Sequence, residues 1–284
     1  MEIKNVCVVG AGLMGRQIAM NAAISGYSVT LTDNSAAVLG EAEKWAGEYL
    51  AGRIAKGRMT GQQVAEIQNR FKAESALAAA ADNVDLVIEA IVEILEIKQD
   101  FFRQLDKIIR PDTIVATNSS YMVSSLFADC FADPSRLANA HYYNPALVMK
   151  FVEVVQGPHT SEATVNALMA FMEKNGKSAV LMKKEIDGFV ANRILRRIND
   201  EAMFLVEGGY CTYQDVDLAC EQALGHPMGP FRLTDLTGID LTYDIMKKGY
   251  EMTGVKATGF NLIESMVEAG RLGRKTGKGF YDYA

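Results

Sequence analysis

An imidazole, an amide and a carboxylate stand in a mostly apolar and aromatic run of the chain, AHYYNPALVMKFVEVV at residues 140–155. They are His141, Asn144 and Glu153. An imidazole titrates near neutral pH and can take a proton from an alcohol, and a carboxylate beside it fixes the tautomer of the ring. Because a carboxylate in an apolar strand needs a polar partner, a proton-accepting pair of His141 and Glu153 is one interpretation of the run. A structural histidine at a strand end and a solvent-facing Glu153 on an edge strand are the alternative interpretations.

A second chemical motif, GAGLMG, places Gly10, Gly12 and Gly15 at GxGxxG spacing. It follows the apolar run NVCVV and opens a helical pattern, and a second apolar run ends at Asp33. This is the context of a dinucleotide-binding turn, in which glycines permit a tight turn, a close pyrophosphate and close helix packing. Asp33 can accept hydrogen bonds from the ribose and would repel a 2′-phosphate, so the sequence predicts NAD rather than NADP. The alternative is a glycine-rich turn without a ligand.

The elements around these motifs alternate between strands and helices. This alternation predicts an α/β fold with a Rossmann-like doubly wound sheet, whose ligands bind beyond the C-terminal ends of the strands. Ser119, Ser120, His141 and Asn144 all fall at such ends. Further strands are expected at residues 85–91, 113–120, 136–144 and 151–157, and helices at residues 97–109 and 161–175.

The second part of the chain has only helical patterns. A long helix is predicted in DGFVANRILRRINDEAMFLVEGG, with Asp187 as its cap and Gly208 and Gly209 at its end, and TYQD resembles another helix start. We therefore expect an NAD-binding domain at residues 1–186 and an all-helical C-terminal domain at residues 187–284. Since no low-complexity linker separates them, close packing of the two is expected.

The composition narrows the class of protein. Of the residues, 49% are hydrophobic and 23% are charged, which is typical of a globular protein. A net charge of −6 argues against nonspecific nucleic-acid binding. The most apolar windows contain acids every few residues, and the N-terminus does not read as a secretory signal, so neither a membrane span nor export is expected. The four cysteines match no metal or redox spacing, which predicts a cytoplasmic protein without a metal site.

The chain resembles the NAD-dependent L-3-hydroxyacyl-CoA dehydrogenases, including the 3-hydroxybutyryl-CoA dehydrogenases of bacteria. The likeness extends over essentially the whole chain and rests on the segments DLVIEAIVE, ATNSS, HYYNP, MKFVEV, GFVANR and GHPMGP. It implies an enzyme that interconverts (S)-3-hydroxyacyl-CoA and 3-oxoacyl-CoA with NAD, acts on short acyl chains, and forms a homodimer through its helical domain.

The resemblance also implies roles for individual residues. Ser120, His141, Glu153 and Asn192 match the family's catalytic residues, with His141 as the base and with Ser120 and Asn192 as donors to the substrate oxygen. Arg53 and Lys56, in the basic segment AGRIAKGRMTG, match the region that binds the CoA phosphates, although a solvated helix face is an alternative interpretation. The expected cofactor contacts are Gly10, Gly12, Leu13, Met14, Gly15, Asp33, Glu93, Lys98, Asn118 and Asn144.

Several positions depart from the family pattern. NSSYM stands where NTSSL is usual, HYYNP where HFFNP is usual, and Asp187 where a proline precedes the glycine. The added phenols of Tyr121, Tyr142 and Tyr143 leave the acyl chain and the thioester open. A dehydrogenase of a hydroxy acid without CoA and a catalytically silent NAD-binding protein are therefore alternative functions.

Overall fold

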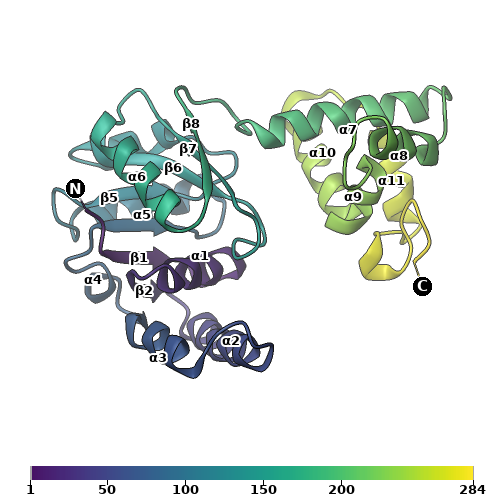
Figure 1. Ribbon diagram of the computed structural model, residues 1–284. Coiled ribbons are helices and arrows are strands. Elements are labelled where there is room, and N and C mark those ends of the chain that lie inside the picture. Colours follow the sequence, from purple (N-terminus) through teal and green to yellow (C-terminus); the bar gives the residue numbers. More distant parts are fainter. Residues whose placement is uncertain (1, 284) are drawn as a thin grey trace. The chain divides into compact units, whose positions relative to one another are not determined.

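The computed structural model describes residues 2–283. The chain divides after Phe189 into two compact units, the first formed by the residues up to Phe189 and the second by those from Val190 on (Figure 1). Among the described residues, no helix combines the length and apolar character that a membrane crossing requires.

The first unit is built on an eight-stranded sheet with the strand order β3-β2-β1-β4-β5-β6-β7-β8. Strands β1 to β6 run parallel, and β7 pairs with β6 in the antiparallel sense. The strand order reverses between β1 and β4, which creates the switch point where such sheets bind ligands. The predicted doubly wound, Rossmann-like sheet is confirmed. Its strands are β1 (Asn5–Val9), β2 (Ser28–Thr32), β3 (Phe71–Ala73), β4 (Leu86–Glu89), β5 (Ile114–Thr117), β6 (Leu137–Tyr142), β7 (Phe151–Val155) and β8 (Ser178–Met182).

Apolar side chains cover both faces of this sheet. Val6 and Val8 of β1 join one buried cluster, and Cys7 and Val9 join another, because successive strand residues point to opposite faces. This two-sided burial explains the continuous apolar runs of the central strands. The first cluster includes residues of α1 (Leu13–Ile24), α2 (Ala36–Ala55), α3 (Gly61–Arg70) and α6 (Glu162–Lys174), and the second includes residues of α4 (Leu77–Ala80), α5 (Leu95–Asp106) and the 3-10 helix η1 (Ser124–Cys130), which is followed by η2 (Pro134–Arg136).

The second unit is helical, as predicted, around a separate buried cluster that includes Phe231 and Ile263. Thr212 and Asp215 form a capping box at the start of α8. The buried carboxylate of Asp235 accepts hydrogen bonds from the backbone N–H groups of Phe280 (2.8 Å) and Tyr281 (3.0 Å), which holds the C-terminal segment against α9. The elements are α7 (Ala191–Glu207), α8 (Tyr213–Gln222), α9 (Pro230–Thr237), α10 (Ile239–Thr253), α11 (Phe260–Glu268) and the 3-10 helix η3 (Arg274–Thr276).

The long helix α7 ends at Gly208 and Gly209 as predicted, but it begins later than the sequence pattern indicates. Its N-cap position is Val190, so the helix starts beyond Asp187, the residue predicted to occupy that position. Gly188 and Phe189 have φ angles of 73° and 50°. These values lie in the left-handed region, which no α-helix can include, so the backbone turns before the helix starts.

Candidate active site

The glycine turn between β1 and α1 has the geometry that close backbone packing requires. Gly10 has a φ of 99°, and a Cβ atom there would lie 2.5 Å from the carbonyl oxygen of Ala90. A Cβ at Gly15 would lie 1.7 Å from the carbonyl oxygen of Gly10, so helix and turn touch directly. A Cβ at Gly12, in contrast, would meet nothing within 4 Å. The N-terminus of α1 has no side-chain cap, so its N–H groups and the open space beside Gly12 fit a phosphate.

Asp33 is held at the end of β2, next to this turn. One of its carboxylate oxygens accepts a hydrogen bond from the backbone N–H of Ala11 (2.8 Å), and the other accepts one from the N–H of Ser35 (2.8 Å). The carboxylate is thereby fixed beside the glycine turn, the position from which an acid reaches the ribose of a dinucleotide. The residues present fit this cofactor.

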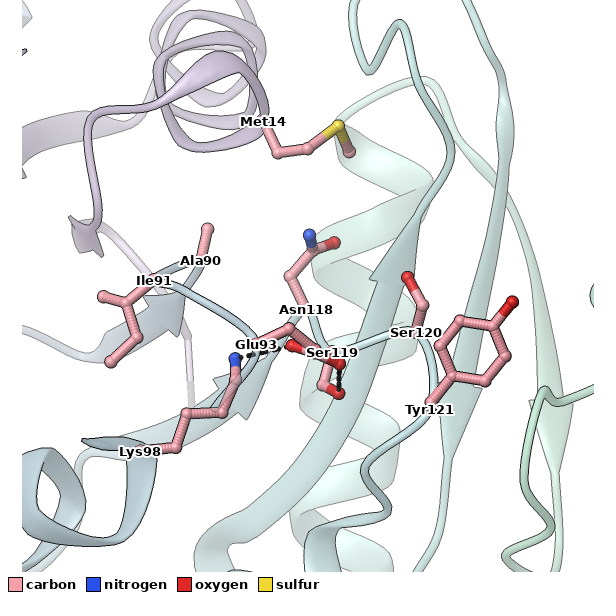
Figure 2. A pocket seen from close by; sticks show the side chains of 9 residues that line it. All are labelled: Met14, Ala90, Ile91, Glu93, Lys98, Asn118, Ser119, Ser120 and Tyr121. Atoms are coloured by element: carbon pink, nitrogen blue, oxygen red, sulfur yellow. Dashed lines mark hydrogen bonds and ion pairs between the residues drawn. The ribbon is translucent and has the colours of Figure 1, made fainter. Parts of the chain in front are cut away.

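A cavity of about 240 Å³ lies at the C-terminal ends of β4 and β5 (Figure 2). Several residues that the sequence predicts as cofactor or substrate contacts lie together here, although they come from separate segments of the chain. Tyr121 lines the cavity with them. Its lining consists of Met14, Ala90, Ile91, Glu93, Lys98, Asn118, Ser119, Ser120 and Tyr121.

An ionic network supports one wall of the cavity. The Lys98 ammonium is 1% exposed and lies 2.6 Å from Oε1 of Glu89, which is fully buried, and 3.1 Å from Oε2 of Glu93 (Figure 2 shows the Glu93 contact). Glu89 also accepts hydrogen bonds from the hydroxyl of Thr117 (2.6 Å) and the N–H of Ile91 (2.7 Å). Glu89 was not predicted as a site residue. The signal in the sequence is an acid inside the apolar run DLVIEAI, which requires a buried partner.

Glu93 is the more exposed carboxylate of this network. Burial raises the pKa of its carboxyl. The Lys98 ammonium and a hydrogen bond from the Ser119 hydroxyl lower the pKa by more than burial raises it, so the net pKa lies below the ordinary value. Glu93 is therefore an anion at neutral pH that lines the cavity, with its charge partly balanced by Lys98.

The histidine and the glutamate that opened the sequence analysis face each other across the antiparallel pair of β6 and β7. His141 lies directly opposite Glu153 in the strand register. Nδ1 of His141 lies 2.9 Å from Oε2 of Glu153, and Nε2 lies 3.1 Å from the hydroxyl oxygen of Ser120. Glu153 is fully buried, and β8 pairs with the other side of β7, so the edge-strand interpretation does not hold. The Tyr143 hydroxyl donates to the same Oε2 at 2.8 Å, a contact that was not predicted.

The remaining predicted residues are distributed as follows. Asn118 lines the cavity, and its side-chain oxygen accepts a hydrogen bond from the N–H of Tyr142 (2.9 Å). Leu13 and Asn144 are exposed beside the turn and after β6, respectively. Asn192 lies in the first turn of α7, in the second unit.

The predicted CoA-binding residues lie apart from the cavity lining, at the C-terminal end of α2. Arg53 is in the last turn of this helix and Lys56 is its C-cap. The Arg53 guanidinium lies 5.9 Å from the ring centroid of Tyr49, which stacks on Trp45 at 5.5 Å. The segment therefore combines positive charge with aromatic surface.

Fold and site together define the class of protein, a dehydrogenase that uses a dinucleotide. Two family models match nearly all of the chain. They describe the NAD binding domain of 3-hydroxyacyl-CoA dehydrogenase, at residues 5–186, and the C-terminal domain of 3-hydroxyacyl-CoA dehydrogenase, at residues 188–283. The chain belongs to the 3-hydroxyacyl-CoA dehydrogenase family.

Individual relatives and solved structures are similar to the chain over its whole length. The chain is 38% identical over its full length to the "Probable 3-hydroxybutyryl-CoA dehydrogenase" of Bacillus subtilis and covers 98% of it. The crystal structure of (S)-3-hydroxybutyryl-CoA dehydrogenase from Ralstonia eutropha is similar with a TM-score of 0.89 and 31% identity, with both chains covered completely. A diketoreductase that acts on dicarbonyl compounds is similar with a TM-score of 0.90 and 28% identity, again over both complete chains.

The ionic network predicts a large effect on stability. Lys98→Met should lower the free energy of unfolding by about 3–5 kcal/mol, because it leaves the carboxylate of Glu89 buried without its ammonium. Glu89→Gln combined with Lys98→Met removes both charges and should recover much of this loss. Urea unfolding followed by the fluorescence of Trp45, the single tryptophan, measures both variants in the first unit.

Lys72→Met, which replaces an exposed lysine of the same unit, is the control and should change the unfolding free energy by less than about 0.5 kcal/mol. A similarly small loss for Lys98→Met would contradict a charged pair between Lys98 and Glu89.

Proposed function

We propose that the protein interconverts (S)-3-hydroxyacyl-CoA and 3-oxoacyl-CoA with NAD⁺ and NADH, and that 3-hydroxybutyryl-CoA and acetoacetyl-CoA are its substrates. The hydrogen-bonded series of Ser120, His141 and Glu153 carries the proposal. It supplies a proton acceptor with a buried carboxylate behind it and a hydroxyl in front of it. Membership of the 3-hydroxyacyl-CoA dehydrogenase family supports the substrate class.

In the direction of oxidation, Nε2 of His141 takes the proton of the substrate hydroxyl. Glu153 keeps Nδ1 protonated and stabilises the imidazolium that forms. Ser120 donates a hydrogen bond to the reacting oxygen, and Asn192 is proposed as a second donor to it. When bound, NAD supplies the hydride acceptor, and the residues of the first unit orient it.

We propose that this cofactor is held by residues of the glycine turn and its neighbourhood, by residues that line the cavity, and by Asn144 after β6. The open space at the N-terminus of α1 and the fixed carboxylate of Asp33 support this assignment. A domain boundary at residue 187 is proposed as well, and the limits of the two family models, residues 186 and 188, support it. The proposed cofactor residues are Gly10, Gly12, Leu13, Met14, Gly15, Asp33, Glu93, Lys98, Asn118 and Asn144.

We also propose that the protein is a cytoplasmic homodimer joined through its second unit, as the family resemblance implies. Large apolar side chains at the surface of this unit support a protein contact. Phe204 on α7, Leu241 and Ile245 on α10, and Met252 are all exposed. Such side chains are stabilised when a second copy removes them from water.

A second candidate keeps the fold and the proton chemistry but acts on a carbonyl or hydroxy compound without CoA. The likeness to the diketoreductase over the complete chain favours it. A catalytically silent NAD-binding protein is the third reading, and the buried pair of His141 and Glu153 argues against it, because a buried ionisable pair is costly to retain without a use. The rate of NADH oxidation with acetoacetyl-CoA separates the three.

The base assignment predicts the result of one substitution. His141→Gln removes the proton acceptor at similar size and should lower kcat with acetoacetyl-CoA about 10²–10⁴-fold. NADH affinity should stay within about threefold of the unmodified value, because the glycine turn is formed by other segments. His159→Gln, in the loop after β7, is the control and should retain activity. A His141→Gln enzyme with unchanged kcat would show that another group takes the proton.

The CoA assignment predicts a charge effect at the end of α2. Reversal of charge in Arg53→Glu combined with Lys56→Glu should raise KM for acetoacetyl-CoA on the order of tenfold and leave kcat nearly unchanged, because these residues bind a remote part of the substrate. The N-acetylcysteamine thioester, which lacks the nucleotide of CoA, should not respond. Lys44→Glu on the same helix is the matched control. An equal KM for acetoacetyl-CoA in all three proteins would favour a substrate without CoA.

The fixed position of Asp33 predicts cofactor selectivity. kcat/KM should be higher with NADH than with NADPH by about tenfold or more, because the carboxylate repels the 2′-phosphate. Asp33→Asn removes the charge at the same size. It should lower the ratio of kcat/KM with NADH to kcat/KM with NADPH, mainly by weakening the binding of NADH. Asp112→Asn, at an exposed acid of the first unit, should leave the ratio unchanged. Equal efficiencies of the two cofactors with the unmodified enzyme would refute the role of Asp33.

A further inference from the structure

Tyr143 makes a contact that the proposed reaction does not require. Its hydroxyl donates to Oε2 of Glu153 at 2.8 Å, the same oxygen that lies 2.9 Å from Nδ1 of His141. Its ring and the His141 ring form a T-shaped pair, with 4.5 Å between centroids and 61° between planes, and its centroid lies 5.6 Å from that of Phe151. Two aromatic contacts thus hold the phenol in place, and its hydroxyl is directed at the carboxylate.

We propose that Tyr143 is a positioning residue that sets the pH range in which His141 accepts a proton, by sharing Oε2 of Glu153 with the imidazole. The inference rests on the proposed function of His141 as the base. A phenylalanine at this position could keep the two ring contacts but would lack the hydrogen bond to Glu153. The Tyr143 hydroxyl can therefore change the proton affinity of the base, which a phenylalanine side chain cannot do.

The direction of the effect follows from the dipole of the hydroxyl group. Its hydrogen points at Oε2 of Glu153, so the positive end of the O–H dipole is turned toward the place where the imidazolium charge develops. The hydrogen bond also withdraws negative charge from the oxygen that stabilises the imidazolium. Glu153 is fully buried and His141 is 3% exposed, so little solvent screens either effect. Tyr143 therefore disfavours the protonated ring, and its removal should favour that form.

Four residues of the first unit, each from a different segment of the described chain, contact the His141 ring. Glu153 lies on β7, Tyr143 follows β6, Ser120 follows β5, and Phe189 contacts the ring at 5.3 Å. Of these four, Glu153 and Tyr143 are titratable. Glu153 favours the imidazolium through its charge, and the Tyr143 hydroxyl opposes it, so changes at the two residues should act in opposite directions.

Tyr143→Phe is the direct test, because it keeps both ring contacts and removes only the hydroxyl. Tyr142→Phe is the matched control. It changes the adjacent residue in the same way, but Tyr142 belongs to the buried cluster on the opposite face of the sheet from His141. Glu153→Gln completes the set as the variant with the opposite expected sign. Far-UV circular dichroism shows whether all variants keep the native fold.

Two measurements read the effect. The first is the titration of the histidine rings by NMR in the free protein, where three histidines give few signals and His141→Gln assigns the relevant one. The second is the pH profile of kcat/KM for 3-hydroxybutyryl-CoA at saturating NAD⁺. In Tyr143→Phe both midpoints should move to higher pH by about half a unit, as expected for the loss of one hydrogen bond, while the plateau of kcat/KM stays within about threefold.

Tyr142→Phe should leave both midpoints unchanged, and Glu153→Gln should move them to lower pH with a lower plateau. Coincident midpoints for Tyr143→Phe and the unmodified protein, or a shift to lower pH, would overturn the inference. A ring titration that moves as expected in a protein without turnover would support the role of Tyr143 toward His141 and refute the proposed function. Failure of the Tyr143 inference can therefore be distinguished from failure of the proposed function.

Discussion

The burial of carboxylates at the C-terminal edge of the sheet is the constraint on which the site depends. Glu89 on β4 and Glu153 on β7 are both fully buried. A carboxylate that is removed from water must recover its lost hydration through hydrogen bonds or a counter-charge. Each acid therefore determines the position of the groups around it. Glu89 forms hydrogen bonds with Lys98, Thr117 and the backbone after β4, and Glu153 forms them with His141 and Tyr143.

The reversal of chain direction at β7 makes the second of these arrangements possible. In an antiparallel pair, directly opposed residues of two strands lie on the same face and close together. His141 and Glu153 are such a pair. β5 runs parallel to β6, so the segment after its C-terminal end brings Ser120 to the other ring nitrogen of His141. The reversal of direction between β6 and β7, which β8 shares, thus places a carboxylate behind the imidazole and a hydroxyl in front of it.

The sequence predicts the parts of this arrangement that depend on local pattern. The apolar run at residues 5–9, the glycine turn and Asp33 all follow from neighbouring residues, and β1 has these bounds. Side-chain contacts between neighbouring elements were missed, notably that of Lys98 on α5 with Glu89 on β4. Two strands at the ends of the sheet were missed as well, because β3 has only three residues and β8 is partly exposed. The start of α7 depends on left-handed backbone at Phe189, which a bulky residue rarely adopts.

The two buried acids differ in the kind of partner that balances them. Glu89 pairs with a lysine that supports the cavity wall, whereas Glu153 pairs with the histidine proposed as the base. The ammonium of Lys98 is ion-paired with both Glu89 and Glu93, so these residues form a fixed unit that shapes the wall of the cavity. An imidazole changes its charge near neutral pH, so the interaction between Glu153 and His141 strengthens when a proton arrives. The second Glu153 donor, the Tyr143 hydroxyl, shares the same carboxylate oxygen and limits how far the carboxylate favours the charged ring. A carboxylate shared between a titrating donor and a neutral one can therefore hold the ring in place without trapping the proton on it.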